Sequence, residues 1–162
     1  MTINNEVQKP DDATLILRRL LKAPQELAFR AWTSPEHIPQ WMQPEPGMII
    51  AGVLMDLRVG GKFRIQMQSP DGEFCTAVGV FQEVKAPERL VYTWDWEKDG
   101  RGDDFGEVEG NTTLLTIEFH NRGEHTEMVL MHSRFATVES RDNHARGWTR
   151  IADCLVRFLD QA

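Results

Sequence analysis

The sequence predicts one α+β domain in which a long C-terminal amphipathic helix packs across a curved antiparallel sheet. Three observations support this fold class. The chain has 162 residues, a length typical of a single domain. Apolar residues recur at every second position through the middle of the chain, between clear turn signals, which is typical of strands. Near the C-terminus the period changes to that of an α-helix.

The start of the chain is predicted to be a tail followed by one strand. Residues 1–12 are polar and are interpreted as a flexible tail, so the domain comprises residues 13–162. Residues 14–21 read TLILRRLL and predict the first strand.

Two short helices are predicted next. Pro24 suits the first turn of a helix over residues 24–32, because its missing N–H is not needed there. Ser34 can cap a second short helix, from which Ile38 and Trp41 would point inward.

Six strands are predicted to form an antiparallel meander, because short turns join them. They cover residues 48–59, 62–68, 74–84, 90–96, 113–119 and 126–132. A polar loop separates the fourth from the fifth.

The last helix has a continuous apolar stripe. The stripe consists of Trp148, Ile151, Ala152, Leu155, Phe158 and Leu159. Gly147 lies inside this helical pattern, where it costs about 1 kcal/mol relative to alanine, so we expect another backbone or a ligand to approach closely there. A twisted sheet wrapped around one helix tends to leave a space between them.

Several short motifs resemble one known family. In order they are Ala23-Pro24, Trp32–Glu36, Trp41, Asp56–Phe63, Asp71-Gly72, Pro87–Trp94, His132 and Gly147-Trp148. With them the chain resembles the START-like (SRPBCC) superfamily of helix-grip proteins. Within it, the chain is similar to small proteins that resemble the C-terminal domain of the Hsp90 ATPase activator. The resemblance implies a helix-grip fold and a cavity for a lipid-like or polyketide-like molecule.

Two positions depart from this family pattern. Met42 and Gln43 stand where the family often has a second tryptophan and a glycine. If they line the pocket mouth, the resemblance implies a ligand different from that of the relatives.

The candidate ligand-binding residues are the apolar side chains expected between sheet and helix, together with one histidine. They are Trp41, Phe63, Ile65, Met67, Trp94, Trp96, Phe119, Leu130, His132, Trp148, Ile151 and Leu155. The same stripe pattern also fits a filled core. Five tryptophans and seven methionines favour a wall that adapts to a varied apolar guest. His132 could orient a ligand, act as a general base, or be structural.

Charge and composition exclude several partners and cofactors. The net charge of −7 opposes binding to nucleic acid and to anionic membranes, and no apolar stretch is long enough for membrane insertion. The polar start lacks a signal-peptide core, which favours the cytoplasm. Cys75 and Cys154 have no zinc-site spacing, so no metal or other cofactor is expected. The acidic loop at residues 95–109 has Gly106 where a calcium loop needs glutamate, and is interpreted as solvated.

Three functions follow from this reading. The first is a non-enzymatic protein that binds a small apolar molecule. The second is a cyclase or hydrolase that uses His132, and the third is a co-chaperone-like interaction protein. Because the sequence begins almost directly at the first predicted strand, we do not expect the activator's separate N-terminal domain, and its Hsp90 role cannot simply be transferred. The sequence leaves a homodimer open.

Overall fold

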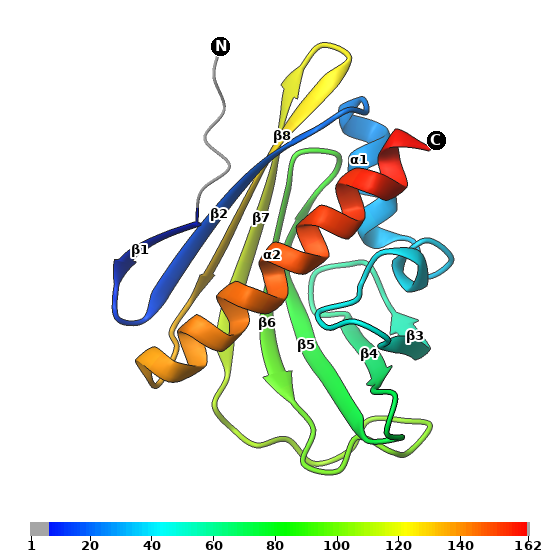
Figure 1. Ribbon diagram of the computed structural model, residues 1–162, viewed down its shortest axis with the longest axis vertical. Helices are drawn as coiled ribbons and strands as arrows, with labels where there is room; N and C mark the ends of the chain where they lie inside the picture. The colour runs from blue at the N-terminus through cyan, green and yellow to red at the C-terminus, as the bar shows by residue number, and fades with distance from the viewer. Residues whose placement is uncertain (1–6, 162) are drawn as a thin grey trace.

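The computed structural model describes residues 7–161. In this part of the chain, eight antiparallel strands form one curved sheet in the order β1-β2-β8-β7-β6-β5-β4-β3. The helices lie on one side of it, and α2 crosses it diagonally (Figure 1). The predicted helix-grip fold is confirmed. Neither helix within residues 7–161 is long and apolar enough to span a bilayer.

The elements follow the predicted order closely. They are β1 (Val7–Asp11), β2 (Thr14–Leu21), α1 (Gln25–Thr33), the 3₁₀ turn η1 (Ile38–Gln40), β3 (Ile49–Met55), β4 (Lys62–Gln68), β5 (Phe74–Lys85), β6 (Arg89–Trp96), β7 (Thr113–Arg122), β8 (His125–Ser133) and α2 (Val138–Asp160).

The predicted tail is wrong where β1 forms. Val7 pairs with Leu17 of β2, and the Ala13 N–H donates to Asp11 Oδ1 in the tight turn between these strands. The segment reads VQKPD and has no apolar alternation. An edge strand tolerates proline and charge because one side of its backbone stays unpaired. The rest of the predicted tail, residues 1–6, lies outside the described residues.

The second predicted helix is a 3₁₀ turn instead. Ser34 is the C-terminal cap residue of α1 rather than the start of a new helix, and only Ile38–Gln40 turn as a 3₁₀ helix. Such turns are usually short because their hydrogen-bond geometry is poorer. The inward direction predicted for Ile38 and Trp41 is correct, since both are buried.

The helix α2 begins well before its apolar stripe. Thr137 caps it, because its hydroxyl accepts a hydrogen bond from the Ser140 N–H at 3.0 Å. Of the strands, β2 is the one that α2 approaches most closely. In Figure 1, α2 runs across the sheet, and β3 and β4 lie to one side of it.

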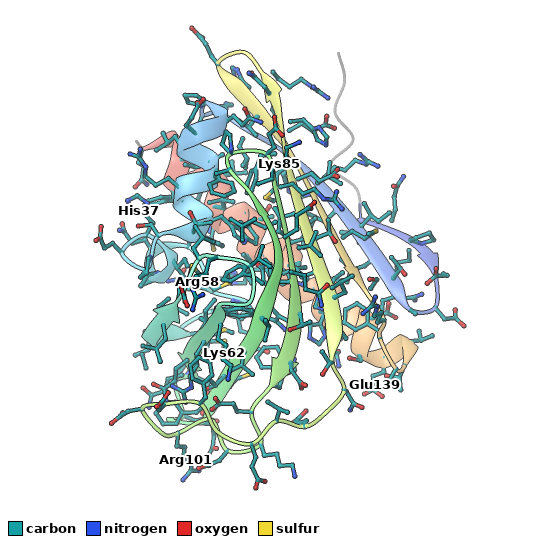
Figure 2. All side chains as sticks on the ribbon, turned by 180° about the vertical axis from the view of Figure 1, so that it is seen from behind. His37, Arg58, Lys62, Lys85, Arg101 and Glu139 are labelled. Carbon is teal, nitrogen blue, oxygen red and sulfur yellow. The ribbon has the colours of Figure 1, made fainter. Side chains whose placement is uncertain are left out.

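The loop after β6 is anchored to the outer face of the sheet at its start, whereas residues 101–112 are exposed, as predicted for a solvated loop. Arg64 and Glu97 form a buried pair with two hydrogen bonds, at 2.9 and 3.0 Å. Burial raises the pKa of Glu97, but hydrogen bonds from Arg64 and from the Gly106 N–H outweigh it and leave the pKa lowered. Figure 2 shows this outer face, with Lys62 on the sheet and Arg101 on the loop. The loop therefore packs on the side of the sheet opposite α2.

Candidate functional site

A cavity of about 560 Å³ lies between α2, the segment after η1 and the ends of β4–β6. It is partly open to solvent, and most of its surface is apolar. Its lining residues are Met42, Pro44, Glu45, Met48, Met67, Ser69, Glu73, Phe74, Cys75, Trp94, Trp96, Asn143, His144, Arg146, Gly147, Trp148 and Ile151.

Strand register explains the sheet side of this cavity. Met67 of β4 pairs with Cys75 of β5, and Ala77 of β5 pairs with Trp96 of β6. Paired residues point to the same face, so β5 contributes small side chains between larger ones. These small side chains leave room on the α2 side of β5.

The helix side is built from one stretch of α2. Trp148 and Ile151 lie three positions apart and so share a face. Gly147 also lines the cavity, and a Cβ atom there would lie 3.4 Å from Pro44 Cβ. Its neighbour there is the Pro44 side chain at an ordinary contact distance, so the expected close approach of another backbone is not found among the described residues.

All five tryptophans form one chain of ring contacts. Neighbouring ring centroids lie 4.8 to 6.1 Å apart along the order Trp41, Trp32, Trp148, Trp94 and Trp96. Trp41 and Trp32 belong to the packed core, whereas the other three line the cavity. The cavity wall is thus continuous with the core and well supported.

His132 stands behind this wall and uses both ring nitrogens. Its Nδ1 accepts a hydrogen bond from the Trp148 indole N–H at 2.9 Å. Its Nε2 therefore carries the proton and donates to Thr113 Oγ1 at 2.6 Å, while that hydroxyl donates to the Trp94 carbonyl. Burial, and then the neighbouring His144, lower the pKa of His132 well below its usual value, so it is neutral. It is fully buried and lies outside the lining of the cavity, in the position of a structural histidine.

His144 repeats this arrangement at the cavity itself. Its Nε2 accepts the Trp96 indole N–H at 3.1 Å, and its Nδ1–H donates to the Ser140 carbonyl at 2.8 Å. Burial lowers the pKa of His144, although the bond to Ser140 opposes this. Two tryptophans of the wall are therefore each held by a neutral imidazole.

The structure separates the twelve candidate residues into three groups. Those that line the cavity are Met67, Trp94, Trp96, Trp148 and Ile151. Two line a void of about 10 Å³, which is roughly the room of one water, namely Phe63 and Ile65. Those buried away from either space are Trp41, Phe119, Leu130, His132 and Leu155. The prediction of a single wall is too broad, because the stripe continues into packed core.

Sequence reasoning missed most of the cavity's rim. The polar side chains there are Glu45, Ser69, Glu73, Asn143, His144 and Arg146. Nothing in their spacing marks them, since they come from a loop, a turn and the polar start of α2. Two features of the sequence did indicate this cavity. Met42 departs from the family pattern, Gly147 interrupts a helical pattern, and both residues line the cavity.

Cys75 is a cavity residue without nucleophilic character. Burial and the carboxylates of Glu45 and Glu109 raise the pKa of its thiol to about 11, so it stays protonated near neutral pH. Among the residues that the structure describes, no three His, Cys, Asp or Glu side chains gather in a way that could hold a metal ion.

With this geometry in view, comparison with known proteins shows the family. Residues 22–160 match the family described as "Activator of Hsp90 ATPase homolog 1-like protein". The chain belongs to this family. The predicted resemblance is confirmed. No curated protein gives a significant match.

Solved structures agree with the fold. A Nitrosomonas europaea protein is 27% identical, with a TM-score of 0.74, and the match covers 93% of this chain and 96% of the other. The AHSA1 protein of Silicibacter pomeroyi is 24% identical with a TM-score of 0.77, over 92% and 99% of the two chains. A protein from Arthrobacter aurescens is 19% identical with a TM-score of 0.79, over 97% and 92%. The last two likenesses concern the fold alone.

Proposed function

We propose that this protein binds one small, mostly apolar molecule, of the lipid or polyketide kind, in the cavity between α2 and β4–β6. The observation that carries this proposal is the cavity itself, with about 560 Å³ and an apolar wall of three tryptophans. Sites for small molecules usually have roughly 300–1,000 Å³, mostly apolar walls and a few polar groups. The cavity combines these features.

The arrangement of the wall supports binding rather than catalysis. Trp148 and Trp96 are fixed by His132 and His144, so both imidazoles are already engaged. The raised pKa keeps the Cys75 thiol protonated near neutral pH, which makes it a poor nucleophile. The remaining polar groups lie at the rim, where they can order water or a polar end of the guest. The cavity, rather than membership of the family, carries the proposal.

Native mass spectrometry of protein purified from its own host provides the first test. We expect a retained mass in addition to that of the chain, and organic extraction should release it. A chain that carries no extra mass and whose melting temperature no apolar compound raises would contradict the proposal.

A matched pair of variants locates the binding. Met48 lines the cavity and is 7% exposed, whereas the next residue, Ile49, is 56% exposed. We expect Met48→Trp to fill part of the cavity and to weaken binding of the hydrocarbon fluorene by about tenfold. Ile49→Trp adds the same ring to the outside and should leave the affinity unchanged. Equal affinities of both variants would place the probe elsewhere.

A further inference from the structure

The lining of the cavity changes in character from its rim to its buried part. Charged and polar side chains of the rim, among them Glu45, Glu73 and Asn143, are exposed. Met42 and Met67 belong to the same lining but are each only 1% exposed. A guest therefore meets polar groups at the mouth and apolar side chains at the inner end.

Met42 also lines the small void of about 10 Å³, which we call the inner void. Among the described residues, Met42 alone lines both spaces. On β4, Ile65 lines the inner void and Met67 lines the cavity. These two residues lie two positions apart on one face of the strand, which corresponds to roughly 7 Å. The two spaces are therefore neighbours, and Met42 belongs to the wall that they share.

The inner void suits an apolar group better than a water molecule. A buried water needs two to four polar partners. The polar side chains of this lining already bond elsewhere, since the Trp32 indole N–H donates to Tyr92 Oη at 3.0 Å and the Thr33 hydroxyl donates to the Phe29 carbonyl at 2.9 Å. The remaining side chains of the lining are apolar. The space behind Met42 is thus suited to a methyl or methylene group.

We infer that Met42 limits the length of the guest, and that the guest carries an unbranched alkyl chain whose end rests on Met42. This inference rests on the proposed function and adds a residue that determines specificity. A methionine side chain is flexible, so it can shift into the inner void when a chain end presses on it. A fused ring fits the main cavity but is too wide for a space of about 10 Å³.

A series of straight-chain alcohols, from 1-octanol to 1-tetradecanol, tests the length limit. The quantity to measure is the dissociation constant of each alcohol, by calorimetric titration. Each added CH₂ should raise the affinity about fourfold while the cavity can bury it, and the gain should stop at a limiting length. Met42→Ala removes the end of the side chain and joins the two spaces. We expect the gain to continue in this variant for about two more carbons.

Met48→Ala serves as the matched control. Met48 is another buried methionine of the cavity lining, at 7% exposed, but it is not among the described residues that line the inner void. The variant removes the same atoms and should change the affinities of all the alcohols alike, so that the limiting length stays as in the wild type. Met42→Val is the milder second variant, with an expected shift of about one carbon, and it provides the test if Met42→Ala does not fold.

The methionine methyl signals give a direct readout that a purely structural role would not change. In protein labelled with ¹³C at these methyl groups, the Met42 signal is identified by its loss in a Met42 variant. We expect a nuclear Overhauser effect between the Met42 methyl group and the terminal methyl group of the alcohol of limiting length. With 1-octanol, whose chain ends further from Met42, this effect should be much weaker.

The outcomes separate the two proposals. If the alcohols bind but their limiting length is the same in the wild type and in the Met42 variants, the role of Met42 is wrong and the binding function stands. The same holds if Met48→Ala shifts the limit as much as Met42→Ala. If fluorene binds and no alcohol does, the alkyl chain is wrong and the binding function again stands. If neither fluorene nor any alcohol binds up to its solubility limit, the binding function fails, and the inference fails with it.

Discussion

The two halves of the space between α2 and the sheet are built differently. Against β2, β7 and β8 the space is filled, and Leu155, Phe119 and Leu130 have at most 1% of their surface exposed. Against β4–β6 the space holds the cavity. The filled half has an extra layer, because α1 packs on β7 and β8 there, and Phe29 contacts Phe119 edge-on at 5.8 Å. In the other half, the segment after η1 forms the corresponding side of the cavity.

This difference shows that apolar periodicity alone does not distinguish a core from a pocket. One stripe of α2 serves both halves, with Leu155 in the filled part and Ile151 at the cavity. Whether the space next to α2 is a packed core or a cavity depends on how many side chains the other elements contribute to it. The comparison gives three expectations, from the largest effect to the smallest.

The first expectation compares two neighbours on α2. Leu155→Ala should lower the free energy of unfolding by about 4 kcal/mol, because it opens a hole in close packing. Ile151→Ala should cost about 2 kcal/mol, since part of its side chain already faces empty space, and it should weaken fluorene binding where Leu155→Ala does not. Denaturant unfolding and probe titration measure both. Equal stability losses would mean that the two halves are packed alike.

The second expectation concerns the two histidines. Both have a lowered pKa in the folded protein, whereas the unfolded chain takes up protons near pH 6.5. The unfolded state then binds more protons, so stability should fall as the pH drops below about 6.5, by about 1.4 kcal/mol per pH unit for each histidine that stays neutral. Unfolding curves at a series of pH values measure this slope.

A variant separates the contributions of the two histidines to the pH dependence of stability. His144→Gln removes the histidine at the cavity and keeps His132 behind the wall, so the contribution of His132 to the slope should remain. A stability that does not change with pH over this range would contradict the neutral, engaged imidazoles of His132 and His144.

The smallest effect is expected at Gly147. Gly147→Ala should raise the free energy of unfolding by about 0.5–1 kcal/mol through helix propensity, since the new Cβ would be in ordinary contact with Pro44. The added methyl group lies in the cavity lining, so fluorene affinity should fall slightly. A loss of stability would show that the segment after η1 cannot accommodate a side chain here.

The sequence predicts elements well where local chemistry decides them. Residues 14–21 and 62–68 coincide with β2 and β4. Residues 62–68 alternate strictly, whereas residues 14–21 alternate only in part and are bounded by Ala23-Pro24. β1 was missed because only its pairing with β2 makes it a strand. The twelve candidates include five cavity residues, since direction toward the helix can be read from periodicity. Whether such a residue is packed in the core or lines the cavity depends on the position of α1 and on the curvature of the sheet, which periodicity does not encode.

The chain of tryptophan rings has an optical consequence. Indoles whose centroids lie 4.8 to 6.1 Å apart exchange excitation energy readily, so the five rings should emit as a coupled set. A guest that touches only Trp94 or Trp148 can therefore quench light absorbed as far away as Trp41. The protein carries a built-in fluorescence reporter of its own occupancy, and no external label is needed to follow exchange of a guest.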